Sequence, residues 1–572
     1  MHPLGGAMTN ELTSGRIRSA RKSKFLVFLA SSSLLAVWGS QAFADDAQIA
    51  KLQAEIHRIE ARQQAEIGAL RAEIHHLKRH GGPIYATKDA EPPPLLGPHV
   101  IESSKGPVHF GFADADAQNT VELTGQLNID TGGYVGYHQV SPGLTPPGKA
   151  GLGNAGLASG INFRRARIGV QGVFLGDWAY RIQYDLGGTS DGYSNAATGI
   201  TNNGAASGIE NAFISYDGLY KHGGPLPTEF TIGAIDVPWT LDEPVGSPNI
   251  LFMERASSQV IATAFGGGDN RTALGFHSNT DRLWVGGFLT GPTTGQLHSN
   301  NAYTSYNPAT GAPYGTGIGP QYAGLFRASY NIFQDKANNA TLHVGFNFAD
   351  TFLPRVNSSS ASVEGISLSD RPELRIDPTQ LIGTNTIAAH GGQVFGAEAA
   401  ATYQNAFIQG EYYHYIIDTR NQGAAGAVYE ATNGPAVAFN GGYVQGSYTF
   451  GGRRYYVPGT GAYSGVIPDH PFVLGTGYWG ALELAGRFDI VDLNAAAPYY
   501  NGGNATGTGA GAAILGGEQT SYGAGATWYP NNNLRFMLDY EHVVVNVPAY
   551  LGGPNHYGGT VDWIAARSQF VF

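Results

Sequence analysis

One pattern dominates the chain from residue 119 to its end: apolar and polar residues alternate with a period of two. The first stretch places Val121, Leu123, Leu127 and Ile129 between polar residues such as Glu122. Successive side chains of a β-strand point to opposite faces, so each stretch forms a strand with one apolar and one polar face. A closed barrel with lipid outside and water inside accommodates both faces.

Roughly sixteen such stretches occur, an even number as in bacterial outer-membrane barrels. Long connections rich in Gly, Ser, Asn and Pro alternate with short turns between them. The predicted fold class is an all-β transmembrane protein, an antiparallel outer-membrane β-barrel of about sixteen strands over 119–572. The expected strands lie near 120–138, 161–175, 177–187, 208–218, 228–236, 270–279, 281–291, 321–331, 339–350, 393–403, 405–418, 440–450, 478–490, 519–529, 533–545 and 561–572.

Composition agrees with this prediction and narrows the function. Glycine accounts for 82 of 572 residues and charged residues for 13%, against typical values of about 7% and about 25%. A secreted Gly-rich β-solenoid or sandwich is the alternative on composition alone. The absence of cysteine excludes a thiol nucleophile and cysteine metal ligands. The net charge of -11 argues against a nucleic-acid partner.

Residues 1–44 have the pattern of a secretory signal peptide. Arg21, Lys22 and Lys24 precede an apolar run over 25–38, and small residues at Ala42 and Ala44 follow. The run is too short for a comfortable membrane span. Translation could begin at Met1 or at Met8, because the basic region lies unusually far from the start.

A heptad-like pattern follows in residues 45–80, where Ile or Leu recurs at alternating spacings of three and four. This spacing predicts an α-helical coiled coil, and isoleucine at both seam positions of the first half favours three strands. A lone solvated amphipathic helix is the alternative. Residues 81–118, with Pro92-Pro93-Pro94, are expected to form a Pro/Gly-rich linker. We expect the coiled coil to lie in the periplasm.

Several segments resemble the phosphate-selective porin O and P family, and the resemblance covers most of residues 120–572. They are Phe163-Arg164-Arg165-Ala166-Arg167-Ile168, Ile232-Gly233-Ala234-Ile235-Asp236-Val237-Pro238-Trp239, Phe252-Met253-Glu254-Arg255-Ala256, Arg371-Pro372-Glu373-Leu374, Tyr443-Val444-Gln445-Gly446-Ser447-Tyr448, Ala481-Leu482-Glu483-Leu484-Ala485-Gly486-Arg487-Phe488 and Trp528-Tyr529-Pro530-Asn531. The resemblance implies a sixteen-stranded porin that forms a homotrimer in the outer membrane of a Gram-negative bacterium. It also implies that the loop near 237–269 and the long turn near 451–477 fold into the pore. The coiled coil would clamp the trimer.

Arginines on the polar strand faces are the candidate pore-lining and anion-binding residues. Strand parity assigns the following arginines to the lumen: Arg165, Arg167, Arg181, Arg327, Arg487, Arg535 and Arg567. If the two segments fold inward, they add Arg255, Arg453 and Arg454. Acidic residues point the same way, among them Glu398, Glu411, Glu483, Asp489, Asp539 and Glu541. The predicted function is passive diffusion of small hydrophilic solutes with a preference for anions such as phosphate. The alternatives are a general or sugar-type porin, or a structural outer-membrane tether. For each arginine, a salt bridge that braces the inner wall is the alternative role.

Nothing in the sequence predicts an enzyme. The stretch Gly188-Thr189-Ser190-Asp191-Gly192 matches the G-x-S-x-G pattern, but it lies in a Gly-rich loop rather than at a strand-to-helix turn. There is no P-loop and no HExxH motif. We therefore expect no catalytic, cofactor-binding or metal site, and we expect the partners to be small anionic or hydrophilic solutes and outer-membrane lipid.

Overall fold

A computed structural model provides the structure of the chain. It describes residues 99–102, 108–114, 116–139, 157–187, 193–196, 199–202, 208–265, 270–293, 305–306, 313–314, 321–357, 363–377, 380–419, 434–499, 512–547 and 557–572. The expected signal peptide (1–44) and coiled coil (45–80) lie outside these residues.

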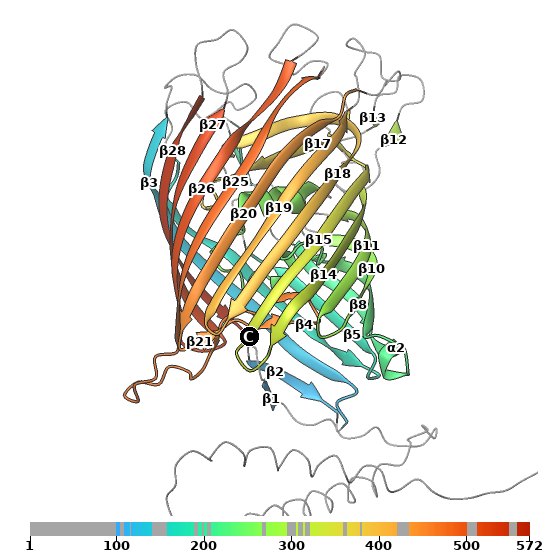
Figure 1. Ribbon diagram of the computed structural model, residues 1–572, viewed down its shortest axis with the longest axis vertical. Coiled ribbons are helices and arrows are strands. Elements are labelled where there is room, and N and C mark those ends of the chain that lie inside the picture. The colour runs from blue at the N-terminus through green and yellow to red at the C-terminus, as the bar shows by residue number, and fades with distance from the viewer. Residues whose placement is uncertain are drawn as a thin grey trace, which may run out of the picture. The chain divides into compact units, whose positions relative to one another are not determined.

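Sixteen antiparallel strands form a closed barrel (Figure 1). β3 (Thr120–Gln139) pairs with β4 (Gly160–Phe174) on one edge and with β28 (Tyr557–Val571) on the other, which closes the ring. The strands between them are β5 (Trp178–Asp185), β8 (Gly208–Tyr216), β9 (Thr228–Ile235), β10 (Arg271–Asn279), β11 (Leu283–Thr293), β14 (Tyr322–Asp335), β15 (Ala340–Leu353), β18 (Ile382–Tyr403), β19 (Ala406–Thr419), β20 (Val437–Phe450), β25 (Ala481–Tyr499), β26 (Ala512–Tyr529) and β27 (Leu534–Val547).

Each expected stretch overlaps one of these strands, so the barrel prediction is confirmed. Three strands extend further from the short-turn end than the alternation indicated: β18 begins at residue 382, β25 ends at 499 and β26 begins at 512. The two faces follow the sequence pattern. On β27, for example, Phe536, Leu538 and Tyr540 are exposed on the outer wall, whereas Asp539 and Glu541 are buried on the inner wall.

The two ends of the barrel differ in the length of their connections. Tight turns such as 175–177 and 280–282 lie at the lower end in Figure 1, where the chain also terminates, and long connections lie at the upper end. Short turns are typical of the periplasmic side of such barrels. α2 (Gly218–Lys221) occupies one of these turns. None of the described helices combines the length and apolar character needed to cross a membrane.

Two strands were not anticipated within residues 81–118, which were expected to be a linker. β1 (His99–Glu102) pairs with β2 (Val108–Ala113), and β2 pairs with β3 from Thr120 to Leu123. The pairing of β28 with β3 starts at Gln126. β2 therefore continues the sheet along the part of the β3 edge that β28 does not reach. Its run Phe-Gly-Phe-Ala is too short to stand out by its alternation.

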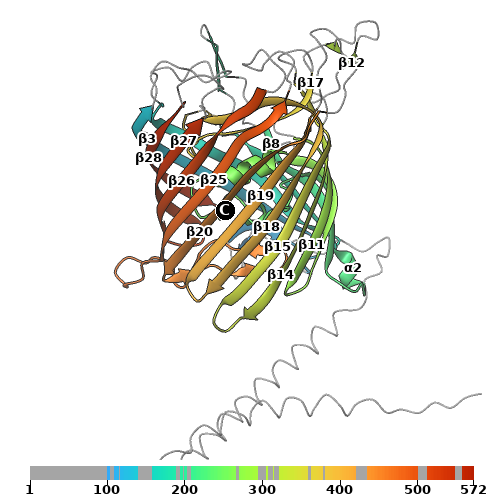
Figure 2. The ribbon, with the colours of Figure 1, turned by 45° about the horizontal axis from the view of Figure 1, so that its top comes forward.

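In the part of the chain that the structure describes, three connections enter the lumen. Residues 236–270 link β9 to β10 and contain η2 (Glu243–Val245) and α3 (Ser257–Phe265); a short green helix is visible inside the ring of strands in Figure 2. The first half of the β20–β25 connection is the second, and the stretch 370–377 is the third, preceding β18. The loop 237–269 and the turn 451–477 were expected to fold inward, but residues 469–477 of that turn lie against the β26–β27 turn instead. The stretch 370–377 was not expected to fold inward. The smaller strands in the connections are β6 (Tyr193–Ala196), β7 (Gly199–Asn202), β12 (Ser305–Tyr306), β13 (Pro313–Tyr314), β16 (Arg355–Asn357), β17 (Val363–Asp370), β21 (Gly452–Arg453), β22 (Tyr456–Val457), β23 (Ala462–Tyr463) and β24 (Ile467–Pro468).

Candidate constriction of the pore

The loop 236–270 is attached across the lumen through its own backbone. The amide of Leu241 donates to Glu411 on β19 at 2.8 Å, and the amide of Met253 donates to Asp539 on β27 at 2.8 Å. A buried amide without a partner is costly, so a wall carboxylate placed opposite it stabilises the loop. Two acids that the sequence places on the pore wall are thus anchors for the loop.

Arginines of the wall hold the carbonyl groups of the same loop. Arg535 donates to the Ile250 oxygen at 2.8 Å, and Arg487 donates to the Glu254 oxygen at 2.8 Å. Arg567 on β28 donates to the carbonyl of Met253. The loop is therefore fixed on several sides, at both its amide and its carbonyl groups.

The second inward segment, residues 451–468, is attached near the periplasmic mouth. Arg327 donates to the carbonyl of Thr460 at 3.1 Å, and the indole of Trp284 donates to the carbonyl of Gly459 at 3.0 Å. Arg454 of this segment reaches the carbonyl of Asn249 in the first loop at 2.9 Å. The two inward segments thus contact each other inside the barrel.

Most of the arginines expected to line the pore are buried in ion pairs. The shortest N–O distances are 2.9 Å for Arg327–Glu398, 2.7 Å for Arg454–Glu483, 2.9 Å for Arg167–Asp185, 3.3 Å for Arg255–Asp242 and 3.6 Å for the half-exposed pair Arg453–Asp469. Arg487 pairs with Glu373 and Glu541. Arg181 donates to Gln183 at 3.2 Å and has no carboxylate within ion-pair distance among the described residues. For most of these arginines the bracing role therefore describes the observed contacts.

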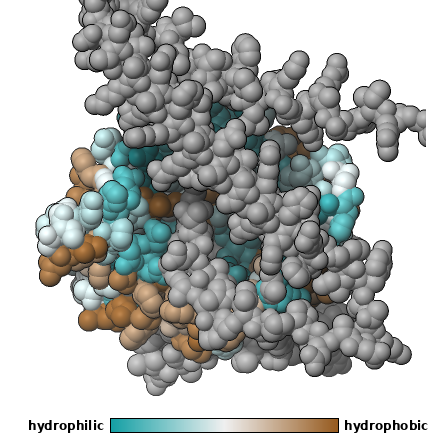
Figure 3. Space-filling model, turned by 90° about the horizontal axis from the view of Figure 1, so that it is seen from below, coloured by the Kyte–Doolittle hydropathy of each residue, from teal (hydrophilic) through white to brown (hydrophobic). Residues whose placement is uncertain are grey.

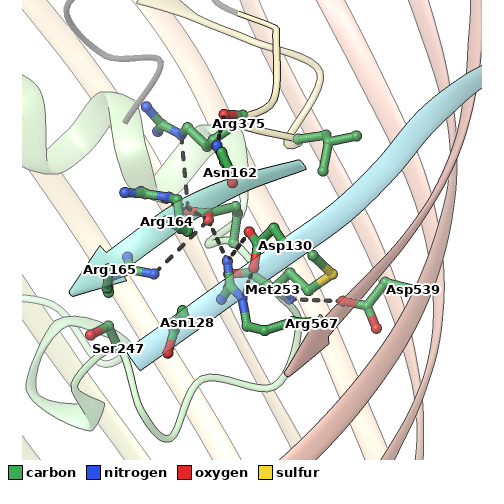
Figure 4. A network of polar contacts seen from close by, with 12 residues as sticks. Asn128, Asp130, Asn162, Arg164, Arg165, Ser247, Met253, Arg375, Asp539 and Arg567 are labelled. Atoms are coloured by element: carbon green, nitrogen blue, oxygen red, sulfur yellow. Dashed lines mark hydrogen bonds and ion pairs between the residues drawn. The ribbon is translucent and has the colours of Figure 1, made fainter. Parts of the chain in front are cut away.

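A different arrangement surrounds Glu254 in the loop (Figure 4). Arg164 and Arg567 lie 2.8 and 2.9 Å from its carboxylate, and Arg165 and Arg375 lie 4.0 and 3.9 Å from it. We call these four arginines the Glu254 cluster. They come from β4, from β28 and from the inward stretch 370–377, so the barrel wall and two inward segments meet here.

A β-bulge explains why the sequence indicated only part of this cluster. Asn128 pairs with Arg165 and Ile129 pairs with Phe163, so Arg164 is an extra residue on β4. A bulge changes which way the neighbouring side chains point. As a result Arg164 and Arg165, adjacent in sequence, both face the lumen. In a strand without the bulge, Arg164 would face the opposite side from Arg165.

Arg375 was also missed, because it lies in an extracellular connection without a periodic pattern. Its guanidinium is 3.6 Å from Asp370, and its carbonyl accepts a hydrogen bond from Asn162 at 3.1 Å. The only signal in the sequence was its position directly after Arg371-Pro372-Glu373-Leu374, a segment that contributes to the family resemblance.

The arginines of the Glu254 cluster also contact other acids, and Arg165 is the least well partnered of them in the hydrogen bonds described. Asp130 pairs with Arg567 at 2.7 Å and Asp370 with Arg375 at 3.6 Å, so acids other than Glu254 also contact the cluster. Nε and Nη1 of Arg165 are buried and have no hydrogen-bond partner among the described residues. Burial would raise the pKa of Glu254, but the charges of Arg164, Arg165 and Arg567 hold that pKa well below its usual range.

The described residues contain no group of His, Asp and Glu side chains placed to bind a metal ion. The arrangement around Glu254 instead brings guanidinium groups from the barrel wall and an inward segment to one carboxylate of the loop. Guanidinium groups bind carboxylate and phosphate oxygens through paired N–H donors.

Comparisons with known proteins agree with the architecture. The family model described as "Phosphate-selective porin O and P" matches residues 150–572. A Caulobacter vibrioides protein described as uncharacterized is 26% identical over 501 residues, which cover 86% of this chain and 83% of that protein.

Solved structures similar to the chain include OmpT of Vibrio cholerae in its trimer form, with 11% identity, coverage of 79% of this chain and 99% of that chain, and a TM-score of 0.40. The anion-selective porin from Comamonas acidovorans has 10% identity, coverage of 79% and 100%, and a TM-score of 0.39. The outer membrane channel DcaP of Acinetobacter baumannii has 9% identity, coverage of 81% and 99%, and a TM-score of 0.39.

Proposed function

The chain belongs to the phosphate-selective porin O and P family, and from that premise we propose that this outer-membrane porin lets small hydrophilic solutes diffuse passively with a modest preference for anions such as phosphate. Its family and fold are those of a channel rather than an enzyme. We further propose that it works as a homotrimer and that the predicted coiled coil at 45–80 clamps the trimer in the periplasm.

The observation that carries the anion preference is the difference in exposure within the Glu254 cluster. The side chains of Arg164 and Arg375 are 11% and 18% exposed, whereas that of Glu254 is 6% exposed. The accessible charge of the cluster is therefore mainly positive. Fixed charge along the path of a solute sets the sign of ion selectivity in channels. Because arginine stays protonated, the preference does not depend on a titrating base.

Two of the acidic residues whose negative charge would oppose an anion preference accept hydrogen bonds from the backbone of the loop. Glu411 accepts hydrogen bonds from the amides of Leu241 and Asp242, and Asp539 accepts one from the amide of Met253. Both carboxylates are buried against the loop. Their charges interact first with backbone donors, so they contribute less to the field at the surface of the pore than their number in the sequence suggests.

Single-channel recordings in a salt gradient test the proposal directly. We expect the wild-type protein in a planar bilayer to show a reversal potential on the anion side, and we expect phosphate to reduce the chloride current. A cation-selective wild-type channel would contradict the anion preference and would favour a general or sugar-type porin. Absence of any conductance from correctly inserted protein would favour the structural tether.

A further inference from the structure

The periplasmic connection between β20 and β25 divides into two parts with different surroundings. Residues 451–468 lie in the lumen, whereas residues 469–480, which we call the periplasmic tongue, lie against the neighbouring β26–β27 turn. The amide of Phe472 donates to Pro530 at 2.6 Å, and the indole of Trp528 donates to the carbonyl of Trp479 at 2.7 Å. Figure 1 shows this orange segment projecting sideways from the lower end of the barrel.

The periplasmic tongue differs in composition from the other turns at the same end. Its stretch 471–480 contains no charged residue, whereas the turns near Asp177, Lys221, Asp281 and Lys336 are charged. Leu474 and Trp479 are 86% and 71% exposed. Contiguous exposed apolar surface of this kind marks a site of contact with a partner or a membrane.

An open groove of about 710 Å³ lies between the tongue and the outer wall of the barrel. Tyr478 and Trp479 line it on one side, and Phe450, Leu482 and Trp528 line it on the other. Its volume lies within the range of about 300–1,000 Å³ that small-ligand pockets have. Figure 3, seen from this end, shows hydrophobic residues gathered on the left and lower left of the rim and hydrophilic residues beside them, nearer the barrel axis.

The position of the groove indicates its occupant. Phe450 ends β20 and pairs with Leu482, the second residue of β25. Both are exposed on the outer wall, where they continue the row that includes Tyr448 and Leu484. This row faces lipid in an outer-membrane barrel, and tryptophan and tyrosine at its edge are typical of the membrane interface. The groove is thus continuous with the lipid-facing wall at its periplasmic edge.

We propose that this groove binds an acyl chain of a phospholipid from the periplasmic leaflet, and that the periplasmic tongue lies in the interface of that leaflet. The ion pair Arg453–Asp469, with an N–O distance of 3.6 Å, lies beside the groove. His470 packs against Tyr478 with ring centroids 4.4 Å apart. The groove therefore has polar groups at one edge and apolar groups along its walls, as an amphipathic lipid requires.

Tryptophan fluorescence in vesicles with brominated acyl chains tests the location of the tongue. The full-length protein is reconstituted in phosphatidylcholine vesicles with and without bromine, and wild type is compared with Trp479→Phe. We expect Trp479→Phe to remove part of the bromine quenching. Trp178→Phe, which removes a tryptophan from the lipid-facing wall, serves as a positive control. Unchanged bromine quenching, with loss of iodide quenching instead, would place the tongue in water and overturn the proposal.

Retention of lipid provides a second, independent measurement. Phospholipid bound per chain is counted by mass spectrometry after mild detergent extraction. We expect Tyr478→Ser with Trp479→Ser to lower retention severalfold, whereas Tyr330→Ser on the lipid-facing wall should leave it unchanged. Equal lipid retention by wild type, the double variant and Tyr330→Ser would overturn the proposal. One result of the fluorescence experiment would also overturn it. If neither bromine nor iodide quenches Trp479 until the oligomer dissociates, the groove is an interface between copies of the chain.

Discussion

Two groups of arginines face the same lumen and differ in what they contact. Near the periplasmic mouth, Arg327 is completely buried, bonds to Glu398 and to two backbone carbonyls, and lies 5.1 Å from the centre of the Trp284 ring. In the Glu254 cluster, Arg165 keeps two buried nitrogen atoms without a hydrogen-bond partner among the described residues. The comparison shows that strand parity predicts which way an arginine faces but does not predict its role. One group holds an inward segment in place, and the other is the one that we propose supplies charge to the pore.

The largest effect on stability should come from the first group. Arg327→Ala would leave Glu398 buried without its main partner, and removing one member of a buried pair costs about 3–5 kcal/mol. We expect earlier unfolding in urea, followed through the fluorescence of the adjacent Trp284. Combining Arg327→Met with Glu398→Gln should recover part of the loss. If Arg327→Ala is as stable as wild type, Arg327 does not brace the periplasmic segment.

The largest effect on selectivity should come from the second group. Replacing Arg164, Arg165 and Arg375 together with Gln should lower the ratio of anion to cation permeability severalfold, measured as a reversal potential. Stability should fall less than in Arg327→Ala, because Arg567 still pairs with Glu254 at 2.9 Å. The matched triple substitution with Lys retains the charge and should retain the preference. If the Lys variant loses the preference as completely as the Gln variant, charge is not its basis.

A smaller effect should follow from neutralising Glu254, the acid at the centre of the cluster. Glu254→Gln should strengthen the anion preference at neutral pH, with some loss of stability. In wild type the lowered pKa keeps Glu254 ionised through neutral and mildly acidic pH, so its charge should change only below the usual range of a glutamate. The stabilising pairs exist above that range and are lost as pH falls through the lowered pKa.

The reversal potentials of wild type and Glu254→Gln should therefore differ at pH 7 and still differ at about pH 4.3, where an ordinary glutamate is half protonated. The difference between the two proteins isolates Glu254 from the other carboxylates that titrate in the same range. A difference that is already half lost at about pH 4.3 would mean that the pKa of Glu254 is not lowered. Identical reversal potentials at pH 7 would mean that Glu254 does not contribute to the field.

The smallest effect is expected for Arg453, which belongs to neither group. Its pair with Asp469 is half-exposed, and such pairs contribute about 0–1 kcal/mol. Arg453→Ala should change neither the urea midpoint nor the reversal potential by more than the error of measurement. A clear shift of the reversal potential would show that the relevant charge extends to the periplasmic mouth and is not confined to the Glu254 cluster.

The strands and the inward direction of two connections could be predicted because they rest on local information. Alternation assigns each strand residue to a face, and the length of the 451–480 connection and the family resemblance indicate where the chain enters the lumen. The Glu254 cluster could be predicted only in part. Arg164 depends on a bulge between two strands, and Arg375 depends on a connection that docks against residues far away in sequence. Neither leaves a periodic signal.

Other predictions concern residues outside the described part of the chain, or properties such as assembly and conduction that contacts within one chain do not test. The signal peptide at 1–44, the coiled coil at 45–80 and the homotrimer remain predictions. So does the role of each arginine in conduction, because a hydrogen bond shows what a side chain contacts and not which ion passes it.

The attachment of the loop 236–270 has a consequence for how pores of this kind can diverge. The wall holds the amides of Leu241 and Met253 and the carbonyls of Ile250 and Glu254, all of which are main-chain groups. Every residue type except proline supplies the same amide, and every residue type supplies the same carbonyl. Substitutions in the loop can therefore change the chemistry of the opening while its position is retained. This separation between anchoring and lining would let mutation explore new permeants without rebuilding the barrel, and it gives protein engineers a defined segment in which to do the same.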